Sequence, residues 1–247
     1  MDPRDRNGSV LTVSNGRASR PRVGHHGLKL SDCEVFVDFD NTVTQFDVID
    51  NILECFSINR DWRTFEDAWR TGRIGSKECL EGQLRSVRIT REALVAYLST
   101  VSVDPSFGPL VTLLKKHGIQ PVIVSDGFSF IIQEILTHQH VGGLVVYANH
   151  LQVVGDRLLP AFPYANGCPR CAHCKKVHVL NSQLAGKKAI YIGDGLSDVC
   201  PAQHADLVFA KGNLLDACRD MGIPCVAFTD LADVYRDLKK GTRCVSG

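Results

Sequence analysis

The segment that most constrains the fold is the short run of residues 35–40, in which β-branched and aromatic residues end in the aspartates Asp38 and Asp40. Such an apolar run is typical of a strand buried on both faces in a parallel sheet. Its aspartates lie at the carboxyl end, where such a strand opens onto a site. Three later segments also place reactive side chains at a strand end or in a loop before a helix. They are residues 124–127, 174–175 and 193–198. The carboxyl ends of parallel strands meet at one edge of a sheet, so we expect the four segments to lie together.

Strands and helices alternate through the rest of the chain, which predicts an α/β fold with a Rossmann-like, doubly wound parallel sheet. The spacing of apolar residues predicts helices at 106–117, 129–137, 176–183, 198–205 and 214–221. Strands are expected at 121–125, 144–149, 189–192, 207–210 and 226–228, and a hairpin at 151–154 and 157–159.

Residues 47–103 interrupt this alternation with an insertion that reads as helical throughout. Apolar residues at spacings of three and four predict helices at 48–56, 62–70, 76–87 and 90–101, with Thr90 as an N-cap. We therefore predict a disordered tail at 1–31, a catalytic core at 32–46 and 104–247, and a small α-helical cap at 47–103 inserted after the first strand.

The overall charge argues against large anionic partners. The formal net charge is +1, divided between a tail of net +4 and a body of net −3. Such a balance gives no strong positive electrostatic field to attract nucleic acid or an anionic membrane. The longest apolar run, residues 93–98, is far shorter than the roughly 18–20 residues of a membrane span. The ten cysteines, without a signal peptide, favour a reducing cytoplasmic location over disulfides.

The acidic side chains at the strand ends predict a metal site. If Asp38, Asp40, Asp194 and Asp198 converge, they repel one another unless a cation lies among them, and hard oxygen ligands suit Mg²⁺. Hydroxyl, ammonium and backbone N–H groups can then hold phosphoryl oxygens, which is what phosphoryl transfer requires. The candidates for this phosphate-binding role are Thr42, Ser125, Asp126, Gly127 and Lys175.

The DxDxT segment, the serine after a second strand, the later lysine and the GDGxSD segment occur in an order that resembles the haloacid dehalogenase superfamily of phosphatases. The helical insertion resembles the small cap of its phosphoserine-phosphatase-like branch. The resemblance implies that Asp38 attacks phosphorus and that Asp40 protonates the leaving oxygen. It also implies that Mg²⁺ is held by the Asp38 carboxylate, the Asp40 carbonyl and Asp194. Lys175, rather than Lys176, and Ser125 would contact the phosphoryl group, while Asp198 would lie beside the metal or orient Lys175.

Two cap positions bear on the substrate. An ungapped alignment places Asp47 where phosphoserine phosphatases bind the amine, and Gln83 where they bind the carboxylate with an arginine. Gln83 offers no charge to a carboxylate, which disfavours phosphoserine. The stretch looks more like methionine-salvage phosphatases that act on 2-hydroxy-3-keto-5-methylthiopentenyl-1-phosphate. The alternative is a phosphatase for phosphoserine, phosphocholine or phosphoethanolamine, with Asp47 as the anion for the ammonium group. More remote alternatives are a phospho-receiver and a zinc-binding module.

A cysteine-rich loop directly precedes the lysine. Cys168, Cys171 and Cys174 could supply three thiolates to a structural Zn²⁺, with a histidine as fourth ligand. The alternatives are a reduced loop without metal and a cysteine pair that oxidises. The histidines that could complete a zinc site are His150, His173 and His178.

Overall fold

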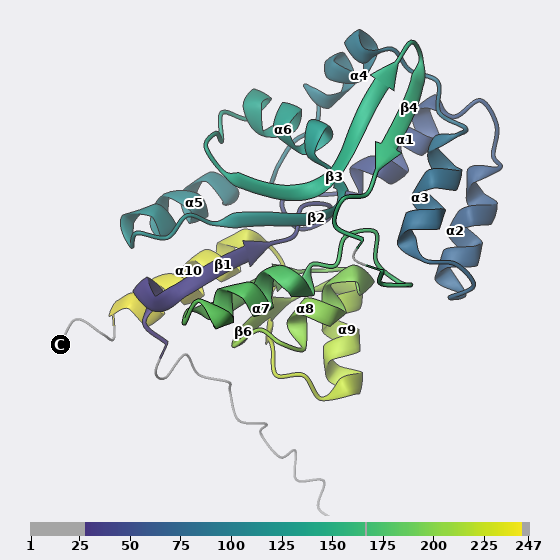
Figure 1. The fold of residues 1–247 in the computed structure, drawn as a ribbon. Coiled ribbons are helices and arrows are strands. Elements are labelled where there is room, and N and C mark those ends of the chain that lie inside the picture. The colour runs from purple at the N-terminus through teal and green to yellow at the C-terminus, as the bar shows by residue number, and fades with distance from the viewer. Residues whose placement is uncertain (1–27, 166, 244–247) are drawn as a thin grey trace, which may run out of the picture.

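The computed structural model describes residues 28–165 and 167–243 and shows an α/β fold around one sheet (Figure 1). Seven strands lie in the order β4-β3-β2-β1-β5-β6-β7, with β1 at the centre. All neighbouring pairs are parallel except β3 and β4. The doubly wound arrangement predicted from the sequence is therefore confirmed. The strands are β1 (Cys33–Val37), β2 (Val122–Phe128), β3 (Val145–Val154), β4 (Arg157–Ala161), β5 (Lys188–Gly193), β6 (Leu207–Ala210) and β7 (Val226–Ala227).

Successive residues of β1 point to opposite faces of the sheet, and both faces are covered by helices. Val35 and Val37 belong to the large core cluster, whereas Phe36 packs on the other side beside Val179. The large cluster includes residues of α5 (Phe107–Lys116), α6 (Ser129–His138) and α10 (Leu231–Arg243), as well as of the helices between β1 and α5. The opposite face is covered by α7 (Lys176–Leu184), α8 (Val199–Ala202) and α9 (Gly212–Met221), which lie side by side in Figure 1.

Four helices occupy the segment between β1 and α5, and we call this segment the cap. α2 and α3 pack against each other at one side of the molecule (Figure 1). Two of these helices have a side-chain N-cap. The Asp47 side chain accepts a hydrogen bond from the Asp50 N–H, and the Thr90 side chain accepts one from the Ala93 N–H. The predicted N-cap at Thr90 is thus confirmed. The cap helices are α1 (Val48–Phe56), α2 (Trp62–Arg70), α3 (Ser76–Leu84) and α4 (Arg91–Leu98).

Three regions differ from the expected elements. β3 is one continuous strand because it pairs with β2 through Asn149 and then, from His150 onward, with β4. The helix expected at 198–205 is a 3₁₀ turn, Leu196–Asp198, followed by the short α8. α10 was not among the predicted helices, although its buried residues Leu231, Val234 and Leu238 follow a helical spacing.

The ends of the chain are described only in part. Of the predicted tail, residues 1–27 lie outside the described residues, whereas Leu28 and Leu30 pack against the core. Residues 244–247, which include Cys244, also lie outside them. Within the described part of the chain, no helix has both the length and the apolar character needed to span a membrane.

Candidate active site

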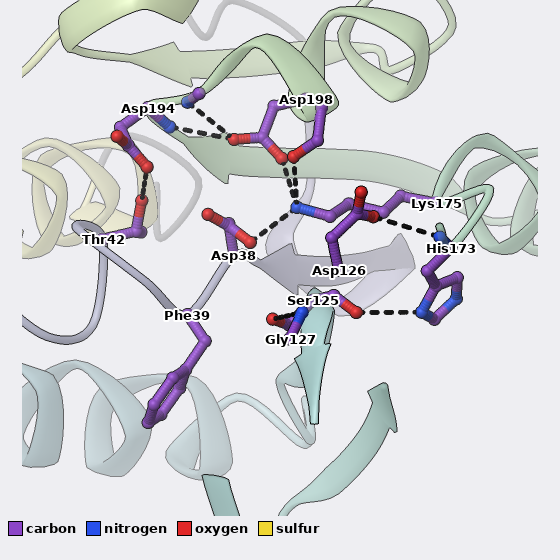
Figure 2. A network of polar contacts seen from close by, with 12 residues as sticks. Asp38, Phe39, Thr42, Ser125, Asp126, Gly127, His173, Lys175, Asp194 and Asp198 are labelled. Atoms are coloured by element: carbon purple, nitrogen blue, oxygen red, sulfur yellow. Dashed lines mark hydrogen bonds and ion pairs between the residues drawn. The ribbon is translucent and has the colours of Figure 1, made fainter. Parts of the chain in front are cut away.

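A buried lysine lies at the centre of the site. Lys175 directly precedes α7, and its side chain is 1% exposed. Its ammonium group donates to Asp38 Oδ1 over 2.6 Å and to Asp198 Oδ1 over 2.7 Å (Figure 2). A third bond reaches Ser197 Oγ at 3.0 Å. Burial disfavours the charged lysine, but the two carboxylates outweigh it and raise the pKa of Lys175 well above its ordinary value.

Asp198 holds this lysine in place. Its Oδ1 also accepts a hydrogen bond from the Tyr191 hydroxyl at 2.6 Å, and its Oδ2 accepts bonds from the backbone N–H groups of Asp194 and Gly195. Gly193 leaves room for the Asp198 carboxylate, since a Cβ on residue 193 would lie 2.5 Å from Asp198 Oδ2. Both oxygens of Asp198 are therefore committed to contacts within the protein.

Three carboxylates converge at the strand ends. Ligand atoms of Asp38, Asp194 and Asp198 lie within 4.8 Å of one another. The Thr42 hydroxyl donates to Asp194 Oδ1 at 3.0 Å, so Thr42 orients this carboxylate. Burial, followed by the charge of Asp198, raises the pKa of Asp194 to about 6. Burial and Asp198 likewise raise the pKa of Asp38 well above its ordinary value, although Lys175 lowers it.

The donor set of this cluster fits Mg²⁺. Among the described residues, no hydrogen-bond partner occupies Asp38 Oδ2 or Asp194 Oδ2. Two such oxygens, on carboxylates whose charge is disfavoured by burial, match the hard ligands that Mg²⁺ takes while keeping waters and substrate oxygens. Asp198, whose oxygens are already bonded, contributes to the cluster chiefly by holding Lys175.

The carboxyl group of Asp40 lies beside the start of the cap. Its Oδ1 accepts a hydrogen bond from the Val48 N–H at 2.9 Å. Burial is the main cause that raises the pKa of Asp40, and the nearby carboxylate of Asp47 adds to it. The protonated form is thus favoured, which is the state a general acid needs.

The strand end at Ser125 is supported from behind by a pair of histidines. Ser125 Oγ accepts a hydrogen bond from the Gly127 N–H at 2.9 Å. His173, which is fully buried, lies 3.0 Å by Nδ1 from the Ser125 carbonyl oxygen and 2.7 Å by Nε2 from His178 Nε2. The His173 N–H also donates to Asp126 Oδ1 at 3.3 Å (Figure 2). These contacts tie the loop that carries Lys175 to the end of β2.

A cavity of about 290 Å³ opens in front of these groups and extends to the cap. Its catalytic side is lined by the core residues described above. Its cap side carries the carboxylates Asp47, Asp50 and Glu66 together with Trp69. Burial, Asp47 and Glu66 raise the pKa of Asp50 to about 7. The cap wall also carries Arg70, which pairs with Glu66, so its negative charge comes chiefly from Asp47 and Asp50.

Gln83, which aligns with the carboxylate-binding arginine of phosphoserine phosphatases, contacts Glu66 of this wall. Its side chain is 2% exposed, and its Nε2 donates to Glu66 Oε2 at 2.9 Å. The other oxygen of Glu66 accepts a bond from Arg70 Nε at 2.8 Å. Gln83 therefore neutralises no charge in the cavity.

The structure gives no support to the predicted zinc site. In the part of the chain that it describes, the cluster with metal-binding spacing is the aspartate cluster, and Cys168, Cys171 and Cys174 form no such group. Two of the histidines considered as a fourth ligand, His173 and His178, are bonded to each other. The alternatives of a reduced loop and of a cysteine pair remain.

Sequence reasoning missed several residues that shape the site. Tyr191 lies in an apolar strand, where a buried hydroxyl needs a partner, and that need was the available signal. His173 and His178 were considered only as zinc ligands, because the contact of His173 with Ser125 and the pairing of the two histidines depend on the fold. Asp50 and Glu66 carried no signal in the sequence, because their exposure to the cavity depends on how α1 and α2 pack.

An α/β sheet with a buried lysine bridging two aspartates, and a third aspartate beside them at the strand ends, is the arrangement that the resemblance to phosphatases of the haloacid dehalogenase superfamily led us to expect. The family model described as "Putative Phosphatase" matches residues 34–214, and the chain belongs to this family.

Similar proteins agree with this assignment. The chain is 26% identical over 213 residues to a 2-hydroxy-3-keto-5-methylthiopentenyl-1-phosphate phosphatase of Brevibacillus brevis, covering 83% of this chain and 95% of the relative. A phosphatase of the same name from Bacillus pumilus is 28% identical over 218 residues, covering 83% and 92%. Among solved structures, a phospho-aspartyl intermediate analogue of phosphoserine phosphatase superposes with a TM-score of 0.65 at 18% identity, covering 83% and 98%. That likeness shows the shared fold.

Proposed function

We propose that this phosphatase hydrolyses a small phosphomonoester through an aspartyl-phosphate on Asp38, with Mg²⁺ as cofactor. The observation that carries the proposal is the Lys175 ammonium held between Asp38 and Asp198 at the edge of the cavity. This contact orients one carboxylate oxygen and supplies a fixed positive charge where a phosphoryl group would lie. We propose the cytoplasm as its location, since nine described cysteines are free.

Each residue has a defined part in the proposed reaction. The Asp38 carboxylate attacks phosphorus, the leaving oxygen departs, and a carboxylic–phosphoric anhydride remains on the protein. Asp40 gives its proton to the leaving oxygen and later takes one from the water that attacks the anhydride. Lys175 and the Ser125 hydroxyl hold phosphoryl oxygens.

Asp38, Asp194 and the Asp40 carbonyl are the proposed ligands of the metal. When bound, Mg²⁺ would offset the negative charge of the carboxylates and of the phosphoryl group. Thr42 fixes the orientation of Asp194 rather than contacting phosphate, because its hydroxyl is bonded to Asp194 Oδ1.

The substrate we favour is 2-hydroxy-3-keto-5-methylthiopentenyl-1-phosphate. The named activity of the relatives supports it, as does a cavity of a size suited to a small metabolite. Trp69 on the cap wall offers an apolar surface for the methylthio end of this molecule.

A phosphomonoester that carries an amine, such as phosphocholine or phosphoethanolamine, is the second candidate. The acidic cap wall favours it, because Asp47 and Asp50 would attract an ammonium group and Trp69 could contact it by a cation–π interaction. An uncharged methylthio group makes no use of these carboxylates.

A screen of phosphorylated metabolites with and without Mg²⁺ tests the proposed activity. We expect turnover only with Mg²⁺, and hydrolysis in the presence of excess chelator would contradict the metal role. Asp47→Asn then separates the two substrates, since the amide still accepts the N-cap bond of α1 but carries no charge. A loss of kcat/KM confined to amine-bearing phosphates supports the second candidate, and an equal effect on all substrates rejects it.

A further inference from the structure

Tyr191 lies in the apolar core, yet its hydroxyl reaches the active site. The residue belongs to β5, is fully buried, and shares a core cluster with Phe36 and Val179. An aromatic ring without a hydroxyl would satisfy this packing, so the core gives no reason for the polar group. The hydroxyl donates to Asp198 Oδ1 over 2.6 Å. One side chain thus joins the core of the sheet to a carboxylate of the site.

The backbone next to Tyr191 makes room for this contact. Residues 191 and 193 point to the same face of β5, because side chains alternate along a strand. A Cβ on Gly193 would lie 2.5 Å from Asp198 Oδ2 and 3.0 Å from Tyr191 Cε1. The missing side chain therefore leaves the space in which the Asp198 carboxylate lies next to the Tyr191 ring.

The ammonium group of Lys175 uses all of its donors within the protein. A lysine ammonium carries three N–H donors. Those of this group reach Asp38 Oδ1 at 2.6 Å, Asp198 Oδ1 at 2.7 Å and Ser197 Oγ at 3.0 Å. To contact a phosphoryl oxygen, the ammonium group must weaken one of these bonds or share an N–H between two acceptors. The strength of its bond to Asp198 therefore controls how far it can turn toward a substrate.

Tyr191 and Lys175 donate to the same oxygen of Asp198. The two donors share the negative charge of this oxygen, so the hydroxyl weakens the hold of the carboxylate on the ammonium group. Without the hydroxyl, Asp198 Oδ1 would attract the ammonium group alone and draw it away from Asp38.

We propose, on the basis of the reaction proposed above, that Tyr191 is a positioning residue for Lys175. Its hydroxyl keeps the ammonium group between Asp38 and Asp198 and lets it turn toward the phosphoryl group during transfer. In the part of the chain that the structure describes, Tyr191 is not one of the residues that line the cavity. It therefore acts through Lys175 and not on the substrate.

Tyr191→Phe in the full-length protein with Mg²⁺ tests this role. We expect kcat for p-nitrophenyl phosphate to fall about 10-fold while KM stays within about twofold, because the displaced ammonium group matters most in the transition state. Orthovanadate, whose trigonal-bipyramidal complex resembles the phosphoryl group in transfer, should inhibit about 10-fold more weakly than in the wild type. Inorganic phosphate should inhibit both proteins alike, whereas a loss of packing alone would weaken both inhibitors.

A crystal structure of Tyr191→Phe gives a second measurement that needs no turnover. The distance between Lys175 Nζ and Asp38 Oδ1 should exceed the 2.6 Å of the unaltered protein, while the bond to Asp198 persists. An unchanged distance to Asp38 would contradict the proposal.

Tyr97→Phe is the matched control, because it also removes one hydroxyl that donates to a side-chain oxygen, that of Asn51 at 2.7 Å. It should keep the kcat of the wild type, and thermal unfolding checks that both variants are folded. A wild type without turnover would contradict the proposed function and this inference together. If the wild type turns over, an equal kcat in Tyr191→Phe, an equal loss in Tyr97→Phe, or an equal weakening of vanadate and phosphate would contradict this inference alone.

Discussion

Lys175 Nζ donates to Asp38 Oδ1 over 2.6 Å, although the two residues are 137 positions apart in the chain. The contact joins the end of the central strand to the loop before α7, and it occupies only one oxygen of the Asp38 carboxylate. Among the described residues, its other oxygen, Oδ2, has no hydrogen-bond partner. The arrangement accounts for how one carboxylate could be both oriented and nucleophilic.

Replacing Asp38 by Asn should abolish turnover, because an amide cannot form the acyl phosphate. We expect kcat to fall by about 10⁴-fold or more. Turnover of p-nitrophenyl phosphate measures the loss, and thermal unfolding checks the fold. Asp61→Asn is the matched control, since this aspartate is exposed and its side chain makes no capping bond. A folded Asp38→Asn protein with full activity would remove Asp38 as nucleophile.

Asp40→Asn should slow the reaction in proportion to the need of the leaving group for a proton. An alkyl phosphate should lose about 10²–10⁴-fold in kcat, because its alkoxide leaves poorly without protonation. p-Nitrophenyl phosphate should lose much less, since p-nitrophenolate is a stable leaving group. A plot of rate against leaving-group pKa for both proteins checks this expectation. Parallel plots would show that Asp40 is not the general acid.

Local patterns in the sequence predicted most of the fold. The helices at 48–56 and 62–70 and the strand at 207–210 have the predicted bounds, because amphipathic spacing and β-branched runs are encoded within each segment. The union of two expected strands into β3 could not be predicted, since it depends on β2 and β4 pairing with successive halves of one strand. In the site, Asp38 and Lys175 could be found from their motifs. The contacts of Tyr191 and His173 required the three-dimensional fold.

Gly82 and Gly108 are both helical glycines, and they should respond oppositely to alanine. A Cβ on Gly82 in α3 would lie 2.2 Å from the Phe65 ring of α2, whereas nothing lies within 4 Å of one on Gly108 in α5. Gly82→Ala should therefore lower the free energy of unfolding by about 1–3 kcal/mol through overpacking. Gly108→Ala should be neutral or stabilise by up to about 1 kcal/mol. Urea unfolding of both variants tests this, and equal shifts would show that α2 and α3 can separate without cost.

His173 should make the stability of the protein depend on pH on the acid side. Burial, the neighbouring His178 and Lys175 lower its pKa to about 3, from an ordinary value of 6.5. Between these values the unfolded chain binds a proton at this position and the folded chain does not. The stability that His173 contributes is therefore complete above about pH 6.5 and declines as the pH falls toward 3, by up to about 1.4 kcal/mol per pH unit.

His173→Asn isolates this effect, because its amide can still donate to the Ser125 carbonyl but does not titrate. Urea unfolding at several pH values between about 4 and 7 should show the wild type losing its advantage over the variant as the pH falls. His138→Asn, at an exposed position at the end of α6, should keep the slope of the wild type. If His173→Asn and the wild type lost stability in parallel, His173 would be charged in the folded protein. Its Nε2 could then not accept the bond from His178, and the pairing that supports Ser125 would have to be different.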